Sequence, residues 1–239
     1  MKGKDINTLM LLLLCALQLV AANQPLARFE EANKLYESGD FEAAKAMYQG
    51  LLSEGYRSDD LHFNLGNTYY KRNQIAFAIL HYEKSLKLNP NNEDARVNLK
   101  MANAKTVDKV ESIPELFIYR WWKSIYNLLP ADTWAKLSVA AVFLSLLLFC
   151  IYLFFQQMQL KKVGFYSSLI AFGLFLLFWF LSATQNSYLQ RKEAAIIMAP
   201  TVNIISAPSE GSSQLFVLHE GTKVKILEEN EMWMRVSLP

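Results

Sequence analysis

Two long apolar runs stand out from the mixed pattern of the rest of the chain. The first covers Leu137–Phe155 and is interrupted only by two serines, and the second covers Val163–Ala183. Because a helix rises about 1.5 Å per residue and the hydrocarbon core of a bilayer is about 30 Å thick, each run is long enough to cross it. Two buried helices of a soluble protein are the alternative, but neither run has a periodic polar face. We therefore predict membrane-spanning helices at residues 137–157 and 163–183.

Small residues mark one place where these two spans can pack closely. Gly164 and Ser168 are four positions apart, so they lie on the same face of a helix. We expect the first span to approach the second at this face.

The N-terminus has the pattern of an export signal. Two lysines precede an apolar run from Leu9 to Val20, and the small residues that follow allow cleavage after Ala22. We therefore assign residues 1–22 to a signal peptide. The two spans then return the chain to the side that the signal reaches, so residues 23–112 and the C-terminal part face the same compartment.

The residues near the spans agree with this topology. The link at residues 156–162 carries Lys161 and Lys162, as the positive-inside rule expects of a cytoplasmic loop. The rule is weakened by basic residues that flank the other side, namely Arg120, Lys123, Lys136, Arg191 and Lys192. Cleavage of the signal removes Cys15 and leaves Cys150 alone, so no intramolecular disulfide is expected. We predict a two-span protein of the bacterial inner membrane with both soluble parts in the periplasm.

Aromatic residues crowd the segment before the first span. Residues 113–134 contain three of the five tryptophans of the chain, with Arg120 and Lys123 among them. Such residues favour the headgroup layer of a bilayer, where rings are half dry and cations reach lipid phosphates. We therefore predict an amphipathic interfacial helix at residues 113–134 in contact with membrane lipid. An aromatic box that binds a cofactor is the less favoured alternative.

The segment before residue 93 repeats with a fixed period of about 34 residues. The aligned pairs are Phe29/Phe63, Asn33/Asn67, Tyr36/Tyr70, Ala44/Ala78, Tyr48/Tyr82 and Leu52/Leu86. In the second unit, Gly66 and Ala78 are small enough for two helices to approach closely, and Pro90 ends the second helix. A period of this length, with small, aromatic and turn residues at fixed positions, indicates a helical solenoid.

The second unit closely resembles the tetratricopeptide repeat. Residues 63–71, read on through Ala78, Tyr82, Leu86 and Pro90, follow the consensus of that family. The resemblance implies three units: a degenerate first repeat at residues 25–58 with Ala32 in the place of the usual glycine, a second repeat at residues 59–92, and a capping helix or partial third repeat at residues 93–110.

In tetratricopeptide repeats the first helix of each unit lines a groove that takes an extended peptide. The resemblance therefore implies a groove lined by residues that offer amide groups or rigid aromatic area. These residues are Phe29, Asn33, Tyr36, Phe63, Asn64, Asn67, Tyr70 and Asn98, with Met101 beside them. Asn33 and Asn64 also match the asparagines of the family's carboxylate-clamp variant, but Phe29, Asp94 and Asn98 stand at its basic positions. The alternative is that Asn33 and Asn67 only join helices through hydrogen bonds.

The C-terminal segment changes to short β-rich runs. They cover Ala194–Met198, Val202–Ile205, Leu215–Leu218, Lys223–Leu227 and Met232–Val236, with turn residues between them. Residues 203–209, Gly221-Thr222 and Trp233 resemble a bacterial SH3-like barrel, so we assign residues 194–239 to an SH3-like segment. The strand that usually closes such a barrel does not follow Trp233, so either one sheet edge is open or the sequence ends early. An open edge invites pairing with another chain.

Composition and charge exclude several classes of protein. Of the 239 residues, 52% are hydrophobic and 19% are charged, which excludes a disordered chain. The formal net charge of +2 does not support a nucleic-acid-binding protein. The three histidines look isolated, without neighbours at metal-ligand spacing, and the sequence has no catalytic triad or phosphate-binding loop. We therefore predict no enzyme activity, no cofactor and no bound metal.

The order of these parts resembles BatE-type proteins of the Bacteroides aerotolerance operon. The predicted fold class is mainly α, with a tetratricopeptide-repeat solenoid, a two-helix transmembrane hairpin and a small all-β segment. The resemblance implies membrane partners with von Willebrand A domains and an AAA+ ATPase, in a complex tied to oxidative or envelope stress. We predict a membrane-anchored scaffold that binds partner proteins on the periplasmic side. An envelope sensor that binds peptidoglycan through the SH3-like tail is the alternative.

Overall fold

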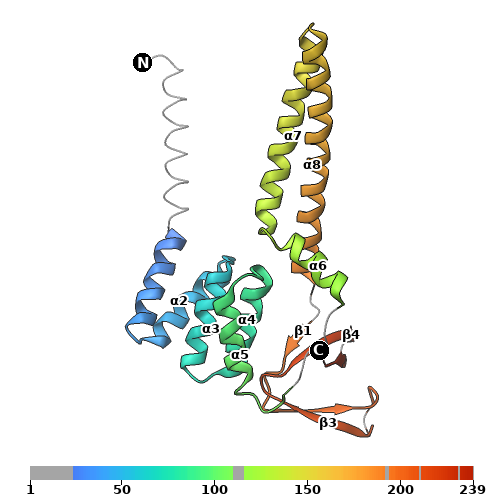
Figure 1. The fold of residues 1–239 in the computed structure, drawn as a ribbon. Coiled ribbons are helices and arrows are strands. Elements are labelled where there is room, and N and C mark those ends of the chain that lie inside the picture. The colour runs from blue at the N-terminus through green and yellow to red at the C-terminus, as the bar shows by residue number, and fades with distance from the viewer. Residues whose placement is uncertain (1–23, 110–115, 192–193, 210, 231, 239) are drawn as a thin grey trace, which may run out of the picture. The chain divides into compact units, whose positions relative to one another are not determined.

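The chain folds into two compact units, drawn as a ribbon in Figure 1. The computed structural model describes residues 24–109, 116–191, 194–209, 211–230 and 232–238, so the signal peptide predicted at residues 1–22 lies outside the described residues. The first unit joins the N-terminal helices to the C-terminal strands, and the second holds residues 111–193 with the short stretch Leu88–Asn91. The predicted fold class is confirmed, because helices dominate and the strands form only a small antiparallel region.

The α-helical part of the first unit is a run of short helices. They cover residues 24–37, α2 (Phe41–Ser53), α3 (Asp59–Lys71), α4 (Ile75–Leu88) and α5 (Glu93–Asn103). The side chains of Asp40, Ser58 and Asn92 cap α2, α3 and α5 by accepting the backbone N–H three positions on. Gly39 and Asn73 stand one sequence period apart, and both have a positive φ in the turn before the next helix. Helix caps and turns therefore recur at the same spacing as the sequence repeat.

Helices α3 and α4 approach each other closely at Gly66. A Cβ atom on this glycine would lie 2.7 Å from the ring of Tyr82, which is shorter than carbon atoms allow. Ala78 and Leu65 are fully buried beside Tyr82, which is only 1% exposed. The small residues that the sequence singled out therefore do permit the helix pair to close.

Helix α5 is shorter than the helix predicted at residues 93–110. It ends at Asn103, and residues 104–109 form turns. The Lys109 ammonium donates to the carbonyl oxygens of Ala104 and Thr106 at 2.8 and 2.6 Å, so these carbonyl groups are satisfied without a further helical turn.

All five β-rich runs of the sequence form strands. These are β1 (Ala194–Ile196), β2 (Thr201–Ile205), β3 (Gln214–His219), β4 (Lys223–Glu229) and β5 (Met234–Ser237). They make two antiparallel sheets, one ordered β1-β4-β5 and the other a β2-β3 hairpin. Among the strands that the structure describes, β1 and β5 are therefore the edges of the larger sheet.

Asp108 fixes the turn between β3 and β4 to the helical part of the same unit. Its carboxylate accepts hydrogen bonds from the Thr222 hydroxyl at 2.6 Å, the His219 backbone N–H at 2.6 Å and the His219 ring Nδ1 at 2.8 Å. These donors, the Thr222 hydroxyl foremost, lower the pKa of Asp108 to about 2. Lys223 adds an ion pair with Glu83 of α4 at 2.7 Å. The strands are thus attached to the repeat by polar contacts.

We expect Asp108→Ala to loosen this turn. The substitution leaves three donors without their acceptor and should cost about 2 kcal/mol of local stability, because hydrogen bonds to charged groups are the strong ones. Hydrogen exchange measured by mass spectrometry should rise over residues 219–223. Asp94→Ala, which removes an exposed carboxylate at the start of α5, is the control and should leave this exchange unchanged. Equal exchange in both variants would contradict the role of Asp108.

The second unit contains α6 (Phe117–Tyr126), α7 (Ala131–Phe154) and α8 (Met158–Gln190). Both α7 and α8 are long and apolar enough to cross a membrane, and only 11% and 17% of their most apolar stretches are buried in the structure. The predicted link of seven residues at 156–162 is wrong, because α7 and α8 are joined by residues 155–157 alone. Lys161 and Lys162 therefore belong to the first turns of α8.

The close approach predicted for the two apolar helices is present. A Cβ atom on Gly164 would lie 2.9 Å from the backbone nitrogen of Tyr152 and 3.0 Å from the carbonyl oxygen of Leu148. Nearby, the Ser145 hydroxyl of α7 donates to the Ser168 carbonyl of α8 at 3.0 Å. Small residues thus bring the two backbones into direct contact.

The aromatic segment before α7 is divided rather than one helix over residues 113–134. Helix α6 ends at Tyr126, and Pro130 stands immediately before α7, so Trp134 lies in the first turn of α7. The Trp134 ring N–H donates to the Tyr126 carbonyl at 3.0 Å, which ties the two helices together. The face of α6 that holds Phe117 and Trp121 is exposed, at 73% and 58% exposure. Helix α6 is therefore shorter than the predicted helix, and its position at a membrane interface stays a prediction.

Candidate functional site

Two asparagines of the predicted groove meet a tyrosine from the second helix of the first repeat. The Oδ1 atom of Asn33 accepts the Tyr48 hydroxyl at 2.7 Å and the Nδ2 group of Asn64 at 2.9 Å. Asn33 lies in the helix of residues 24–37, Tyr48 in α2 and Asn64 in α3. One side-chain oxygen thus joins three consecutive helices.

The same cluster recurs one sequence period later. The Oδ1 atom of Asn67 accepts the Tyr82 hydroxyl at 2.8 Å and the Nδ2 group of Asn98 at 2.8 Å. Burial raises the pKa of both Tyr48 and Tyr82 above the usual value of 10, so their hydroxyl groups stay protonated and remain donors. The repeat of the sequence is therefore a repeat of hydrogen-bond geometry.

Each cluster leaves one donor and one acceptor unused. The two bonds into Oδ1 fix the amide orientation of Asn33 and Asn67 and turn their Nδ2 groups away from the cluster. Within the described residues, these Nδ2 groups and the Oδ1 atoms of Asn64 and Asn98 have no hydrogen-bond partner. The helix-joining role that was the alternative for Asn33 and Asn67 is therefore present, and it leaves half of each amide available.

A cavity of about 230 Å³ lies at the second cluster. Its lining consists of Tyr36, Asn67, Tyr70, Lys71, Tyr82, Asn98 and Met101. Four of the predicted groove residues are thus brought together, while Phe29 and Phe63 instead pack against Tyr48 and Tyr82 at ring-centroid distances of 5.9 and 6.2 Å. We call the cavity and the two asparagine clusters the asparagine groove.

The periodic clusters and the helix pair of α3 and α4 are the features of one known repeat family. Residues 60–92 match the family model of the tetratricopeptide repeat. Tetratricopeptide repeats are scaffolds for protein–protein interaction, so this part of the chain is built to hold protein partners. A comparison with curated proteins finds no match for the chain. The helices on either side of the tetratricopeptide match carry the other members of the two clusters.

Two lysines beside the groove were not found by sequence reasoning. Lys71 lines the cavity, and the Lys105 ammonium lies 4.1 Å from the centroid of the Tyr70 ring. A signal for them was present, since Glu37, Lys71 and Lys105 are successive positions of the tetratricopeptide period. Among the residues that the structure describes, no acidic side chain lines the cavity. The second cluster therefore lies near positively charged side chains.

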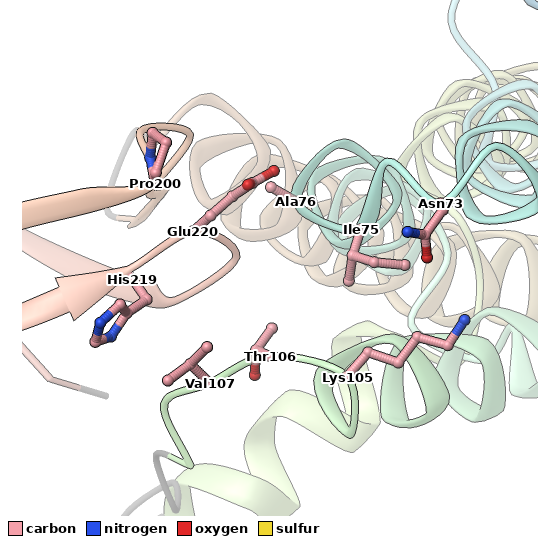
Figure 2. Close-up of a pocket in the computed structure, with 9 residues that line it drawn as sticks. All are labelled: Asn73, Ile75, Ala76, Lys105, Thr106, Val107, Pro200, His219 and Glu220. Atoms are coloured by element: carbon pink, nitrogen blue, oxygen red, sulfur yellow. The ribbon is translucent and has the colours of Figure 1, made fainter.

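A second cavity, of about 260 Å³, lies in the same unit between the repeat and the β3–β4 turn (Figure 2). Figure 2 shows His219, Glu220 and Pro200 on the strand side and Ile75 and Ala76 on the helical side. Asn73, Lys105, Thr106 and Val107 complete its lining. Lys105 lines this cavity, and its ammonium also lies over the ring of Tyr70, which lines the cavity of the second cluster, so the turn held by Asp108 borders the end of the tetratricopeptide repeat.

The expectation that the histidines are isolated is wrong for two of them. His62 of α3 and His81 of α4 are buried, with their Nδ1 atoms 3.0 Å apart, so one ring donates a proton and the other accepts it. Burial, followed by the nearby Lys84 for His62 and by His62 itself for His81, lowers the pKa of both below the usual 6.5. Among the described residues, no group of three or more His, Cys, Asp or Glu side chains could hold a metal ion. The pair is therefore part of the core.

We expect this pair to make the tetratricopeptide helices less stable in mild acid. Below pH 6.5 the two histidines are protonated in the unfolded chain but stay neutral in the folded chain. The free energy of unfolding therefore falls as the pH drops from 6.5 toward the lowered pKa values. The loss between pH 7 and 5 should be about 2 kcal/mol for each histidine and about 4 kcal/mol for the pair, measured by hydrogen exchange of α3 and α4. His62→Gln/His81→Gln should flatten this pH dependence, whereas His219→Gln should not. An unchanged slope in the double variant would contradict the assignment.

Proposed function

We propose that this protein is a membrane-anchored scaffold whose asparagine groove binds extended segments of partner proteins. One observation carries the proposal: each asparagine cluster offers one donor and one acceptor, at equivalent places of consecutive repeats. The backbone of an extended peptide presents carbonyl and N–H groups in alternation, so it can satisfy both. Tyr36, Tyr70 and Met101 supply apolar area for the side chains of such a peptide.

The anchor in this proposal is the hairpin of α7 and α8. Both helices have the length and composition of membrane spans, and their apolar side chains are largely exposed in the structure. The export-signal pattern of residues 1–22 supports a periplasmic position for the repeat and for the strands, at the bacterial inner membrane. The exposed aromatic face of α6 supports contact with the headgroup layer.

The resemblance to BatE-type proteins supports a more specific role within this proposal. It suggests partners among membrane proteins with von Willebrand A domains, in an aerotolerance or envelope-stress complex. Peptidoglycan binding through the strands is less well supported, because the β3–β4 turn is occupied by its contacts with Asp108 and Glu83. These contacts favour a role for the strands beside the repeat rather than an independent wall-binding role.

The groove is tested with a variant that keeps the clusters but removes their outward donors. In Asn33→Asp/Asn67→Asp, the remaining Oδ1 atoms still accept from Tyr48, Tyr82 and their asparagine neighbours, while the Nδ2 donors are lost. Short random peptides, each fused at both ends to a carrier protein, are selected for binding to the full chain in lipid nanodiscs. Affinity for the selected peptides should fall about tenfold, because two hydrogen bonds to the peptide backbone are lost.

Asn103→Asp is the matched control for the added charge, because Asn103 lies at the exposed end of α5 and does not line the cavity. It should retain the affinity of the original chain. Selection of no peptide at all, or equal affinity of the double variant and the original chain, would contradict the groove.

A further inference from the structure

We propose that the asparagine groove selects an acidic side chain at its second cluster, so that a Glu or Asp of the bound segment lies at Lys71 and Lys105. This inference rests on the proposed function, because it names the chemistry of the segment that the groove takes. It concerns a side chain inside the segment and not a free C-terminal carboxylate.

The position of the two lysines supports an acidic ligand. Lys71 lines the cavity together with Asn67 and Asn98, and none of the described lining residues is acidic, so none neutralises its charge. Lys105 lines the neighbouring cavity, but its ammonium lies 4.1 Å from the centroid of the ring of Tyr70, which lines the cavity of the second cluster. Neither ammonium group makes an ion pair within the described residues. A carboxylate at the second cluster would therefore be attracted by two ammonium groups without displacing a carboxylate already paired with them.

The first cluster has the opposite charge, which fixes the position of the acidic residue along the groove. Glu37 is the first-repeat equivalent of Lys71, and Glu30 lies earlier on the same helix. Glu30 and Glu37 stand three positions before and four positions after Asn33, so they share its face of the helix. Their charges add to the effect of burial in raising the pKa of Tyr48. An acidic side chain at the first cluster would be repelled by these groups, whereas it would be attracted at the second.

Hydrogen bonds and charge then have separate roles. The amides of Asn67 and Asn98 form hydrogen bonds with the peptide backbone. They do not distinguish one side chain from another, because every peptide offers the same backbone N–H and carbonyl groups. Lys71 and Lys105 act on one side chain beside that backbone and so provide selectivity. The bound segment is therefore an extended peptide with one acidic position, and its overall charge is of less consequence.

The experiment is a selection of short random peptides on the full chain in lipid nanodiscs, with both peptide ends fused so that no free carboxylate is present. We expect Asp and Glu to be enriched at one position. For a selected peptide, replacing that residue by its amide should weaken binding about fivefold at an ionic strength of about 0.1 M, the effect of a partly exposed ion pair.

Charge reversal in the protein should reverse the preference. Lys71→Glu/Lys105→Glu should enrich Lys and Arg at the same position, and Lys71→Gln/Lys105→Gln should show no charge preference. Both lysines are exposed, so these variants should keep the helix content and thermal unfolding of the original chain. Lys100→Glu, an exposed lysine of α5 outside the cavity lining, is the control and should keep the acidic preference.

The outcomes separate this inference from the proposed function. If no peptide is selected, the groove itself is contradicted. If peptides are selected without an acidic position, or if the acidic preference persists in Lys71→Glu/Lys105→Glu, the groove stands and the acidic site is overturned. Loss of the preference in Lys100→Glu as well would also overturn it, because the effect would then come from net charge alone.

Discussion

Replacing Gly66 with leucine should disrupt the tetratricopeptide helix pair. A Cβ atom at this position already lies 2.7 Å from the Tyr82 ring, and that ring is buried and held by its hydrogen bond to Asn67. The larger side chain must therefore separate α3 from α4, at a cost of about 3 kcal/mol. Hydrogen exchange of α3 and α4, measured on the full chain, should become about a hundredfold faster.

Gly50→Leu is the matched control for this substitution. It also replaces a helical glycine by leucine, but its Cβ atom would meet only the end of the flexible Arg28 side chain, at 3.3 Å. It should leave the exchange of α3 and α4 unchanged. If Gly66→Leu were tolerated as well as Gly50→Leu, the close approach at Gly66 would not be needed for the repeat.

Gly164→Leu should open the helical hairpin of the second unit. The atoms that a side chain would meet there are backbone atoms of Tyr152 and Leu148 at 2.9 and 3.0 Å, which cannot move without displacing α7. The hydrogen bond from Ser145 to the Ser168 carbonyl should be lost with it. We expect a loss of about 3 kcal/mol, seen as unfolding of the hairpin at a lower mole fraction of sodium dodecyl sulfate.

The same helix provides the control. Apart from the backbone of its own helical turns, no atom of the described residues lies within 4 Å of a Cβ added to Gly173 of α8, so Gly173→Leu should leave the unfolding midpoint unchanged. Equal midpoints for Gly164→Leu and Gly173→Leu would show that the two helices do not depend on contact at Gly164.

The asparagine groove was predicted in part from the sequence period. A shift by one period predicted that Asn33 and Asn67, and the tyrosines of the second helices, occupy equivalent places, and the structure confirms this in two nearly identical clusters. The period did not show which amide atom is used inside the cluster and which remains available. That depends on distances across three helices, which no single stretch of sequence contains.

Phe29 and Phe63 illustrate the same limit. Their helical positions place them beside the groove residues, but the aromatic ring reaches the core and packs against the next helix instead of lining the cavity. Lys105 shows the opposite case: it follows the end of α5, and its contact with the Tyr70 ring brings it back to the groove. Long side chains can reach across a helix pair, so sequence position alone does not predict their contacts.

The sequence by itself determined the apolar helices, the helical repeat, the strands and the small residues at which helices touch. These features depend on local periodicity and residue size, which act over one or two turns of helix or one strand. Only the tertiary structure decided that His62 meets His81 and that Asp108 holds a turn 111 residues away. It also decided that Lys71 lines the cavity at the second cluster and that Lys105 contacts the Tyr70 ring there. Such contacts join residues that are distant in the chain, and their energy depends on distance and burial that exist only once the helices have packed.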